Sequence, residues 1–399
     1  MWDRAPEPDR REAPGSRRRL GWSVARLDPL APNGARVSPS PPTRFDPLAS
    51  TRGRDGGFDL FLSGTVFFDL IFTGLPRLPE GGTEVWSDGM GSCPGGVANV
   101  AIASSRLGLR TSVAAAFGDD SYGDFCWETL CEQEGVDLSR SRRYDGWHSP
   151  VTVSMSVERD RSMLTHGHDP PESASAMIGA PPTAQASFIT LGHGIEGWAR
   201  QAHQTGTLLF ADTGWDHSGA WSQDVLSELE FCHAFLPNAP EAMAYTRTDD
   251  PWAALYALAD YVPIAVVTAG AHGSLAVDSV TGEEEWVPAL PVTSIDPTGA
   301  GDVFAAAFVT GTLAKWSLAD RLGFANLAAA LAVQQVGGSL AAPGWGDIAD
   351  WWNHAEQRGS GGTAQWLRRY TFLADLVRDV PAEAVRRATA TIARRSDVG

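Results

Sequence analysis

A run of small residues followed by a carboxylate, Thr298-Gly299-Ala300-Gly301-Asp302, precedes a strongly apolar segment that begins at Val303. Small residues let backbone N–H groups converge on an anion at the start of a helix. A carboxylate in that first turn would repel phosphate, unless it takes the proton of a hydroxyl that attacks the phosphate. The pattern therefore indicates phosphoryl transfer to a small molecule, with Gly299, Ala300 and Gly301 as the anion site and Asp302 as the base. The alternative is a glycine-rich turn whose Asp only stabilises the helix dipole.

Two other segments have residues suited to binding hydroxyl groups. Asp69 is a lone carboxylate in the apolar run 67–72, and a buried carboxylate is costly unless it has a partner. Gly95 and Gly96 permit close approach of the backbone, and Asn99 follows them with both a donor and an acceptor. An Asp in a turn and an Asn that faces water are the structural alternatives.

Two segments favour a nucleotide and its metal. Asn238 and Glu241 follow a short strand, and an amide with a carboxylate three residues later suits hydrated Mg²⁺ and phosphate. The same spacing is also that of a helix capping box, which leaves both interpretations open. Thr268, Gly270 and Gly273 form a glycine-rich turn after a strand, and their backbone could contact a ribose or a phosphate.

Composition excludes several classes of protein. Among the 31 Lys and Arg residues only Lys315 is a lysine, so neither a Walker-type phosphate loop nor a protein-kinase lysine can be built. The net charge of −17 argues against nucleic acid and anionic membranes as partners. The four cysteines lack a CxxC pair, which favours reduced thiols and a cytoplasmic location.

Two motifs are misleading. The segment 192–197 reads GxGxxG, and Asp212 ends the next predicted strand, as in a dinucleotide-binding fingerprint. This segment lies in the middle of the chain, whereas the fingerprint normally opens its domain, so we do not favour a dehydrogenase. The segment 91–95 resembles a nucleophile elbow around Cys93, but Pro94 removes one of the backbone donors that such a site uses.

The chain divides into three predicted regions. Residues 1–54 contain 9 of the 26 prolines and 11 arginines, and we predict a disordered basic tail. Residues 55–350 alternate strand-like and helix-like segments, as βαβ units do. Alternating residues near 82–87 and 149–157 predict strands outside the main sheet. Residues 351–399 are predicted to be a helical extension, with one helix over 364–378.

Taken together, these motifs resemble the pfkB/ribokinase family of carbohydrate kinases over about residues 58–350. The most specific match is the segment 296–302. The glycines before Asn99 match the family's N-terminal signature more loosely, because Pro94 stands about where the family has the first of its glycines. The resemblance implies an α/β fold, a Rossmann-like three-layer αβα domain with a small β-sheet lid. It also implies ATP and Mg²⁺ as cofactors, with K⁺ as an activating ion.

The resemblance also implies roles for individual residues. The sugar would be bound by Asp69, Gly95, Gly96 and Asn99. The nucleotide would be bound by Asn238, Thr268, Gly270, Gly273, Thr298 and Asn326. Glu241 would hold Mg²⁺ through water, and Asp296 would bind the monovalent cation.

We therefore expect an ATP-dependent kinase of a small sugar. A nucleoside kinase of the same fold is the alternative enzyme, and a sugar or nucleotide sensor without turnover is the alternative from another class. The sequence leaves open which sugar is used, and it leaves open whether the chain forms a homodimer.

Overall fold

Short apolar runs form the strands of a central sheet, and their side chains alternate between its two faces. The strands are β1 (Phe58–Ser63), β4 (Thr111–Ala114), β9 (Ala184–Leu191), β10 (Leu208–Thr213), β11 (Ala234–Phe235), β12 (Ile264–Thr268), β13 (Ser274–Asp278) and β14 (Glu283–Val287). They lie in the order β14-β13-β12-β11-β10-β9-β1-β4. The strands from β4 to β12 are parallel, and β13 and β14 are antiparallel.

The computed structural model describes residues 44–52, 57–157, 160–192, 194–214, 216, 218–357 and 362–387.

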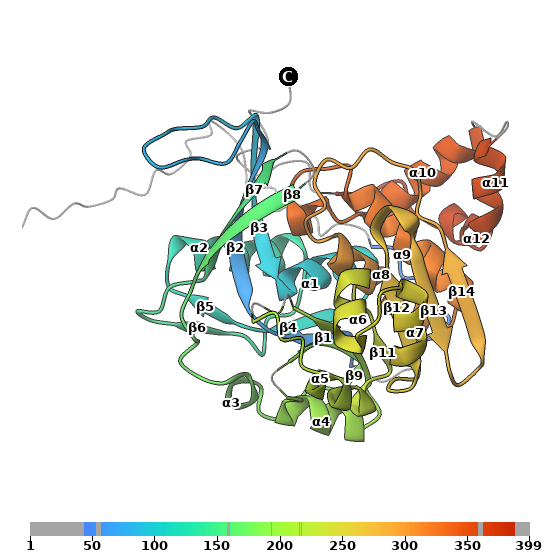
Figure 1. Cartoon of the computed structure of the whole chain (residues 1–399), viewed down its shortest axis with the longest axis horizontal. Helices are drawn as coiled ribbons and strands as arrows, with labels where there is room; N and C mark the ends of the chain where they lie inside the picture. The colour runs from blue at the N-terminus through green and yellow to red at the C-terminus, as the bar shows by residue number, and fades with distance from the viewer. Residues whose placement is uncertain are drawn as a thin grey trace, which may run out of the picture. The chain divides into compact units, whose positions relative to one another are not determined.

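Helices cover both faces of this sheet and create two separate apolar cores (Figure 1). Leu60 and Leu62 contribute to one core, whereas Phe61 between them contributes to the other. The first core includes residues of α1 (Val97–Arg106), α2 (Ser121–Glu128), α8 (Ala300–Leu313), α9 (Leu318–Ala332) and α10 (Trp345–Gln357). The second includes residues of α3 (Ala174–Ile178), α4 (Gly197–Gln204), α5 (Asp224–Glu228), α6 (Ala239–Thr246) and α7 (Pro251–Ala259). The predicted three-layer αβα domain is confirmed. No helix in the described ranges is both long and apolar enough to cross a bilayer.

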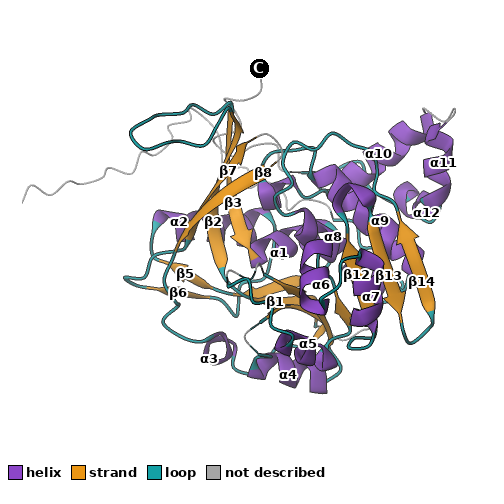
Figure 2. Cartoon of the chain, viewed as in Figure 1, coloured by secondary structure: helices purple, strands orange, loops and turns teal. Residues whose placement is uncertain are grey.

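A second, four-stranded sheet stands apart from the central one (Figure 2). Its order is β3 (Gly89–Gly96), β2 (Val66–Leu75), β7 (Val151–Val157) and β8 (Asp160–His166). We call it the lid sheet. The strand predicted over 149–157 corresponds to β7, but the one predicted near 82–87 is wrong. Residues 82–87 form a loop, because the ladder between β2 and β3 stops at the pair Thr73–Gly89.

The remaining short elements connect these layers. They are the strand pair β5 (Ala116–Gly118) and β6 (Arg142–Tyr144), the π-helical turn η1 (Thr129–Gln133), and the 3₁₀ turns η2 (Leu229–Phe231), η3 (Gly270–His272) and η4 (Gly338–Ala341). The chain bends at Gly64, between β1 of the central sheet and β2 of the lid sheet.

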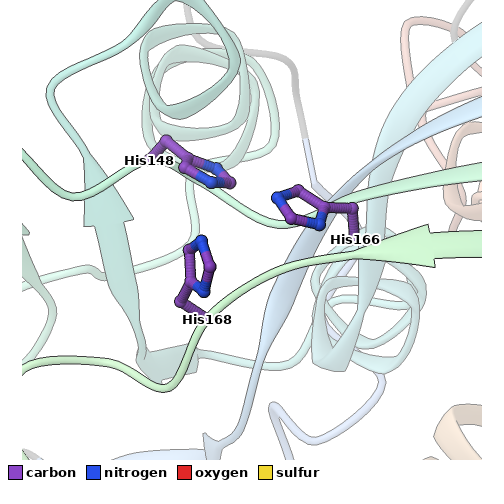
Figure 3. A group of neighbouring side chains, drawn as sticks. All are labelled: His148, His166 and His168. Atoms are coloured by element: carbon purple, nitrogen blue, oxygen red, sulfur yellow. The ribbon is translucent and has the colours of Figure 1, made fainter. Parts of the chain in front are cut away.

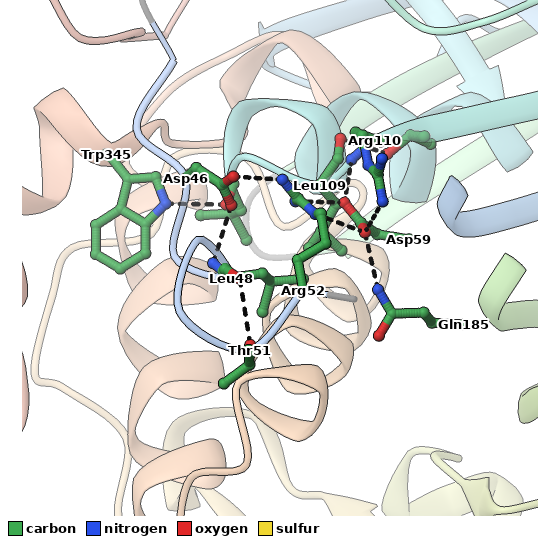
Figure 4. A network of polar contacts seen from close by, with 11 residues as sticks. Asp46, Leu48, Thr51, Arg52, Asp59, Leu109, Arg110, Gln185 and Trp345 are labelled. Atoms are coloured by element: carbon green, nitrogen blue, oxygen red, sulfur yellow. Dashed lines mark hydrogen bonds and ion pairs between the residues drawn. The ribbon is translucent and has the colours of Figure 1, made fainter. Parts of the chain in front are cut away.

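The segment 44–52 packs against the α/β domain, which corrects the predicted boundary at residue 54 (Figure 4). Leu48 is 1% exposed and belongs to the first core. Arg52 donates to the buried carboxylate of Asp59 at 2.6 Å, and Arg44 donates to Ser105. The boundary was misplaced because the apolar anchors are only Leu48 and the partly buried Phe45, within a polar, proline-rich stretch. The rest of the predicted tail lies outside the described residues.

The boundary predicted at residue 350 is also wrong, because it falls inside α10. Two helices follow, α11 (Gly362–Arg369) and α12 (Leu373–Arg378), where one was predicted. Tyr370 between them is fully buried in the first core, and Arg387 forms an ion pair of 3.0 Å with Asp347 of α10. The described part of the C-terminal region is therefore an integral part of the α/β domain.

Candidate active site

The loop before α8 brings the predicted anion site to the start of a buried helix. Gly299 is the N-cap residue and has a φ of 76°, a left-handed conformation that favours glycine. The first N–H groups of a helix have no partner within the helix and can bind an anion, although that of Ala300 donates to the carbonyl of Pro297 at 3.2 Å. The apolar residues of α8 from Val303 onward are buried, which fixes the helix and its first turn. Asp302 lies in that turn.

Asn99 of α1 and Asp302 of α8 are in direct contact. The Nδ2 of Asn99 donates to Oδ2 of Asp302 at 2.9 Å. The Oδ1 of Asn99 is buried and has no hydrogen-bond partner in the structure. A buried acceptor without a partner is costly, so a ligand hydroxyl that donates to Oδ1 would satisfy it.

A first cavity of about 470 Å³ lies over the carboxyl ends of parallel strands. Its lining includes Thr65, Gly96, Asn99, Asp212 and Asp302. Ligands of open α/β sheets bind at this edge. Asn99, predicted to bind the sugar, and Asp302, predicted to be the base, therefore line the same cavity.

Asp69 and Gly95 are packed together on neighbouring strands of the lid sheet, and neither is among the residues that line the first cavity. A Cβ added to Gly95 would lie 1.9 Å from Oδ2 of Asp69. Gly95 therefore makes room for the carboxylate of Asp69. Direct contact of either residue with a sugar stays a prediction.

Cys93 lies on the same strand as Gly95 and is fully buried. Burial, with the nearby charge of Asp69, raises the pKa of its thiol to about 12. A thiol that stays protonated is a poor nucleophile, so the structure supports the decision against a catalytic Cys93.

A second cavity of about 330 Å³ collects most of the predicted nucleotide-binding residues. Its lining includes Thr268, Gly270, Gly273, Ala300, Gly301 and Asn326. Asn326 donates from Nδ2 to the carbonyl of Val287 at 2.9 Å, so part of its amide fixes the end of β14. The residues of η3 and of α9 were far apart in the sequence and are brought together here.

Asp296 fixes the loop that leads to the anion site. Its Oδ1 accepts the N–H of Thr298 at 2.9 Å, and its Oδ2 accepts the N–H of Gly337 at 3.4 Å. Asp296 is 2% exposed. Binding of a monovalent cation by Asp296 stays a prediction, as does contact of Thr298 with a nucleotide.

Asn238 and Glu241 form the capping box that was the structural alternative for them. The N–H of Glu241 donates to Oδ1 of Asn238 at 3.0 Å, and the N–H of Asn238 donates to Oε2 of Glu241 at 3.1 Å. Burial raises the pKa of Glu241, and these hydrogen bonds oppose the shift. Asn238 also forms an isolated backbone bridge with Thr268, and Thr268 lines the second cavity. The cap therefore lies beside that cavity, and a ligand role for Asn238 and Glu241 stays a prediction.

Asp212 is a site residue that the sequence analysis interpreted only as part of a misleading fingerprint. It lies near the end of β10 and lines the first cavity together with Gly194 and Glu196. Asp212 is half-buried, and desolvation of its carboxyl group, with the charges of Glu241 and Asp302, raises its pKa well above the ordinary range. Its position near the carboxyl end of a parallel strand was the signal that could have identified it.

Comparison with known proteins agrees with this arrangement. A sequence model of the pfkB family of carbohydrate kinases matches residues 77–344. A fructokinase from Klebsiella pneumoniae is 29% identical over 310 residues, which cover 71% of this chain and 92% of that protein. A nucleoside kinase from Methanothermobacter thermautotrophicus is 27% identical over 300 residues, covering 72% and 94%.

The fold itself is that of known ribokinases. The structure of Arabidopsis thaliana ribokinase complexed with ribose and ATP matches with a TM-score of 0.59 at 21% identity, covering 72% of this chain and 96% of that one. The lid sheet and the three-layer domain thus have the ribokinase-like arrangement that the motifs predicted. The match of the family model across most of the α/β domain shows that the chain belongs to the pfkB family of carbohydrate kinases.

Proposed function

We propose that this kinase transfers the γ-phosphoryl group of ATP to a hydroxyl of a small sugar. The observation that carries the proposal is the position of the segment 299–302 between the two cavities. Asp302 lines the first cavity, whereas Ala300 and Gly301 line the second. A sugar in the first cavity and a nucleotide in the second would meet at this segment.

The chemistry follows from the groups around that segment. The acceptor hydroxyl would lie near Asp302, which takes its proton as the bond to phosphorus forms. Asn99 holds Oδ2 of Asp302 through Nδ2 and offers Oδ1 to a neighbouring hydroxyl of the sugar. The backbone N–H groups of Gly299, Ala300 and Gly301 would stabilise the negative charge on the transferred group.

A divalent cation is compatible with the carboxylates beside the site. Asp212, Glu241 and Asp302 interact electrostatically, and the charges of the other two raise the pKa of Asp212 in addition to burial. A cation relieves repulsion of this kind, and Mg²⁺ prefers oxygen ligands and retained waters. Glu241, through water, and Asp212 would hold Mg²⁺, which when bound neutralises charge on the nucleotide phosphates. A role for K⁺ at Asp296 is a separate expectation.

The first cavity has an apolar wall as well as polar groups, and this combination indicates which kind of acceptor molecule it can bind. Phe67, Phe188 and Trp198 line it, and Nε1 of Trp198 is buried without a partner. A sugar ring can place its C–H face on aromatic side chains while its hydroxyls bind polar groups. A nucleoside is the second candidate, supported by the similarity to a nucleoside kinase.

A panel of free sugars, sugar phosphates and nucleosides, scored for ADP formation with ATP and Mg²⁺, tests the proposal. We expect ADP formation that depends on a sugar, and a product whose new phosphate ester is located by NMR. ADP formation only with nucleosides would show that the acceptor is a nucleoside and not a sugar. Saturable sugar or nucleotide binding without any ADP formation would instead indicate a sensor.

A further inference from the structure

Three histidines gather at one end of the lid sheet, outside both cavities. His148 precedes β7, His166 is the last residue of β8, and His168 follows two residues later. Because β7 and β8 are antiparallel and pair Val151 with His166, the start of one strand lies beside the end of the other. Figure 3 shows the three rings arranged as a triangle around a common space.

The spacing of the rings suits a single metal ion. One ring nitrogen from each histidine lies within 4.8 Å of the other two. The ring centroids of His148 and His166 are 5.1 Å apart, and His168 is 5.1 Å and 5.2 Å from them. Three nitrogens on one tetrahedral zinc ion are about 3.4 Å apart, given Zn–N bonds of about 2.0–2.1 Å. Side-chain rotation therefore suffices to bring the nitrogens into the coordination sphere.

A backbone carbonyl orients the first of these rings. The Nδ1 of His148 lies 3.1 Å from the carbonyl oxygen of Ser149. A carbonyl only accepts hydrogen bonds, so Nδ1 carries the proton and Nε2 keeps the lone pair that binds a metal. Histidine ligands of metals commonly donate their other nitrogen to a carbonyl in this way. His166 and His168 are exposed, which gives an ion access from solution and leaves a coordination position for water.

We propose that His148, His166 and His168 bind one Zn²⁺ ion that joins the start of β7 to the end of β8. Three imidazoles select zinc and related transition ions over Mg²⁺, which prefers oxygen ligands. The ion would hold the lid hairpin closed at this end. Because β7 pairs with β2 through Thr152 and Asp69, the clamp would stiffen the sheet that carries Asp69. The inference does not depend on the reaction proposed above.

The test uses the full-length protein without a polyhistidine tag, stripped with a chelator and incubated with ZnCl₂. After gel filtration, elemental analysis should find about one zinc per chain in the presence of millimolar Mg²⁺. The variants His166→Ala and His148→Ala/His168→Ala should bind zinc at least about tenfold more weakly in competition with a chromogenic chelator. His203→Ala removes an exposed histidine of α4 and is the matched control, with unchanged zinc binding.

Hydrogen–deuterium exchange shows which strands the bound zinc ion stabilises. Zinc should slow amide exchange in β7 and β8 of the wild type and of His203→Ala, and it should leave the cluster variants unchanged. The variants fold normally if their exchange elsewhere matches the wild type. Zinc binding that is absent from the wild type, equal in the cluster variants, or abolished by Mg²⁺ would overturn the proposal. None of these outcomes depends on whether the protein phosphorylates a sugar.

Discussion

The amide of Asn99 and the carboxylate of Asp302 are joined by a hydrogen bond of 2.9 Å, although 203 positions separate them in the chain. The bond links α1, which directly follows strand β3 of the lid sheet, to α8, which carries the proposed base. It orients Oδ2 of Asp302 while Oδ1 of Asn99 stays available to a ligand. The group proposed to bind the acceptor and the group proposed to act as the base are thereby held in one geometry.

Replacing Asp302 by Asn should abolish most turnover while the protein still folds and binds ligands. Loss of a general base costs roughly 10²–10⁴-fold in rate. Steady-state kinetics measure the loss, and calorimetric titration with ATP and sugar measures binding. Asp375→Asn, which alters a carboxylate 90% exposed on α12, is the control and should keep full activity. Near-normal turnover of Asp302→Asn would show that Asp302 is not the general base.

Replacing Gly95 by Ala should impair the acceptor side of the site. The new Cβ would lie 1.9 Å from Oδ2 of Asp69, so this carboxylate must move. We expect a sharply higher KM for the sugar and an unchanged KM for ATP, and the same pattern for Asp69→Ala. Gly81→Ala, where a Cβ meets nothing within 4 Å, is the control. An equal loss of ATP affinity would show that Asp69 is structural or acts at the nucleotide end.

Replacing Glu241 by Gln should raise the Mg²⁺ concentration needed for half-maximal activity more than it weakens sugar binding. Gln keeps an oxygen that can accept the N–H of Asn238, so the helix cap is retained while the charge is lost. Activity measured against Mg²⁺ at saturating substrates tests this. Glu230→Gln, an exposed position, serves as the control. Collapse of sugar affinity with unchanged Mg²⁺ dependence would contradict a metal role.

Replacing Leu48 by Ala should lower the free energy of unfolding by about 2–5 kcal/mol, the usual range for a buried leucine. A protein that starts at Asp55 should lose more stability than one that starts at Pro41, because it also loses the ion pair between Arg52 and Asp59. This replaces the sequence-based expectation that all of residues 1–54 form a disordered tail. Denaturant unfolding compares the proteins, and equal stability of the two shortened forms would show that the segment does not contribute.

Replacing Asp212 by Asn should increase stability at neutral pH in the absence of Mg²⁺. The pKa of Asp212 is raised in the folded state, so the folded protein binds its proton more tightly than the unfolded chain does. Stability from this group is complete below the unfolded pKa of about 3.9 and falls as pH rises through the folded pKa. The gain from Asp212→Asn should therefore grow with pH. Parallel pH profiles of unfolding for both proteins would contradict the shift.

Much of the fold could be predicted from local patterns. The strands Ile264–Thr268 and Ser274–Asp278 are examples, because buried apolar runs bounded by turn residues have few other conformations available. The strands of the lid sheet are harder to predict from sequence. The alternating segment 82–87 has no pairing partner among the described residues, whereas the glycine-rich β3 pairs with β2. Pairing, which depends on distant residues, outweighs local propensity in such strands.

The sequence by itself determined the chemistry that is available: a small-residue loop with a carboxylate after it, a chain with a single lysine, and a family signature at 296–302. These follow from residue types and short spacings, which need no fold to be recognised. Only the tertiary structure decided that Asn99 contacts Asp302, that Asp212 lines the same cavity as both, and that Leu48 and Tyr370 are buried in the core. Contacts between residues far apart in the chain are fixed when parallel strands bring their carboxyl ends to one edge and when buried side chains find partners on other elements. No local pattern records that outcome.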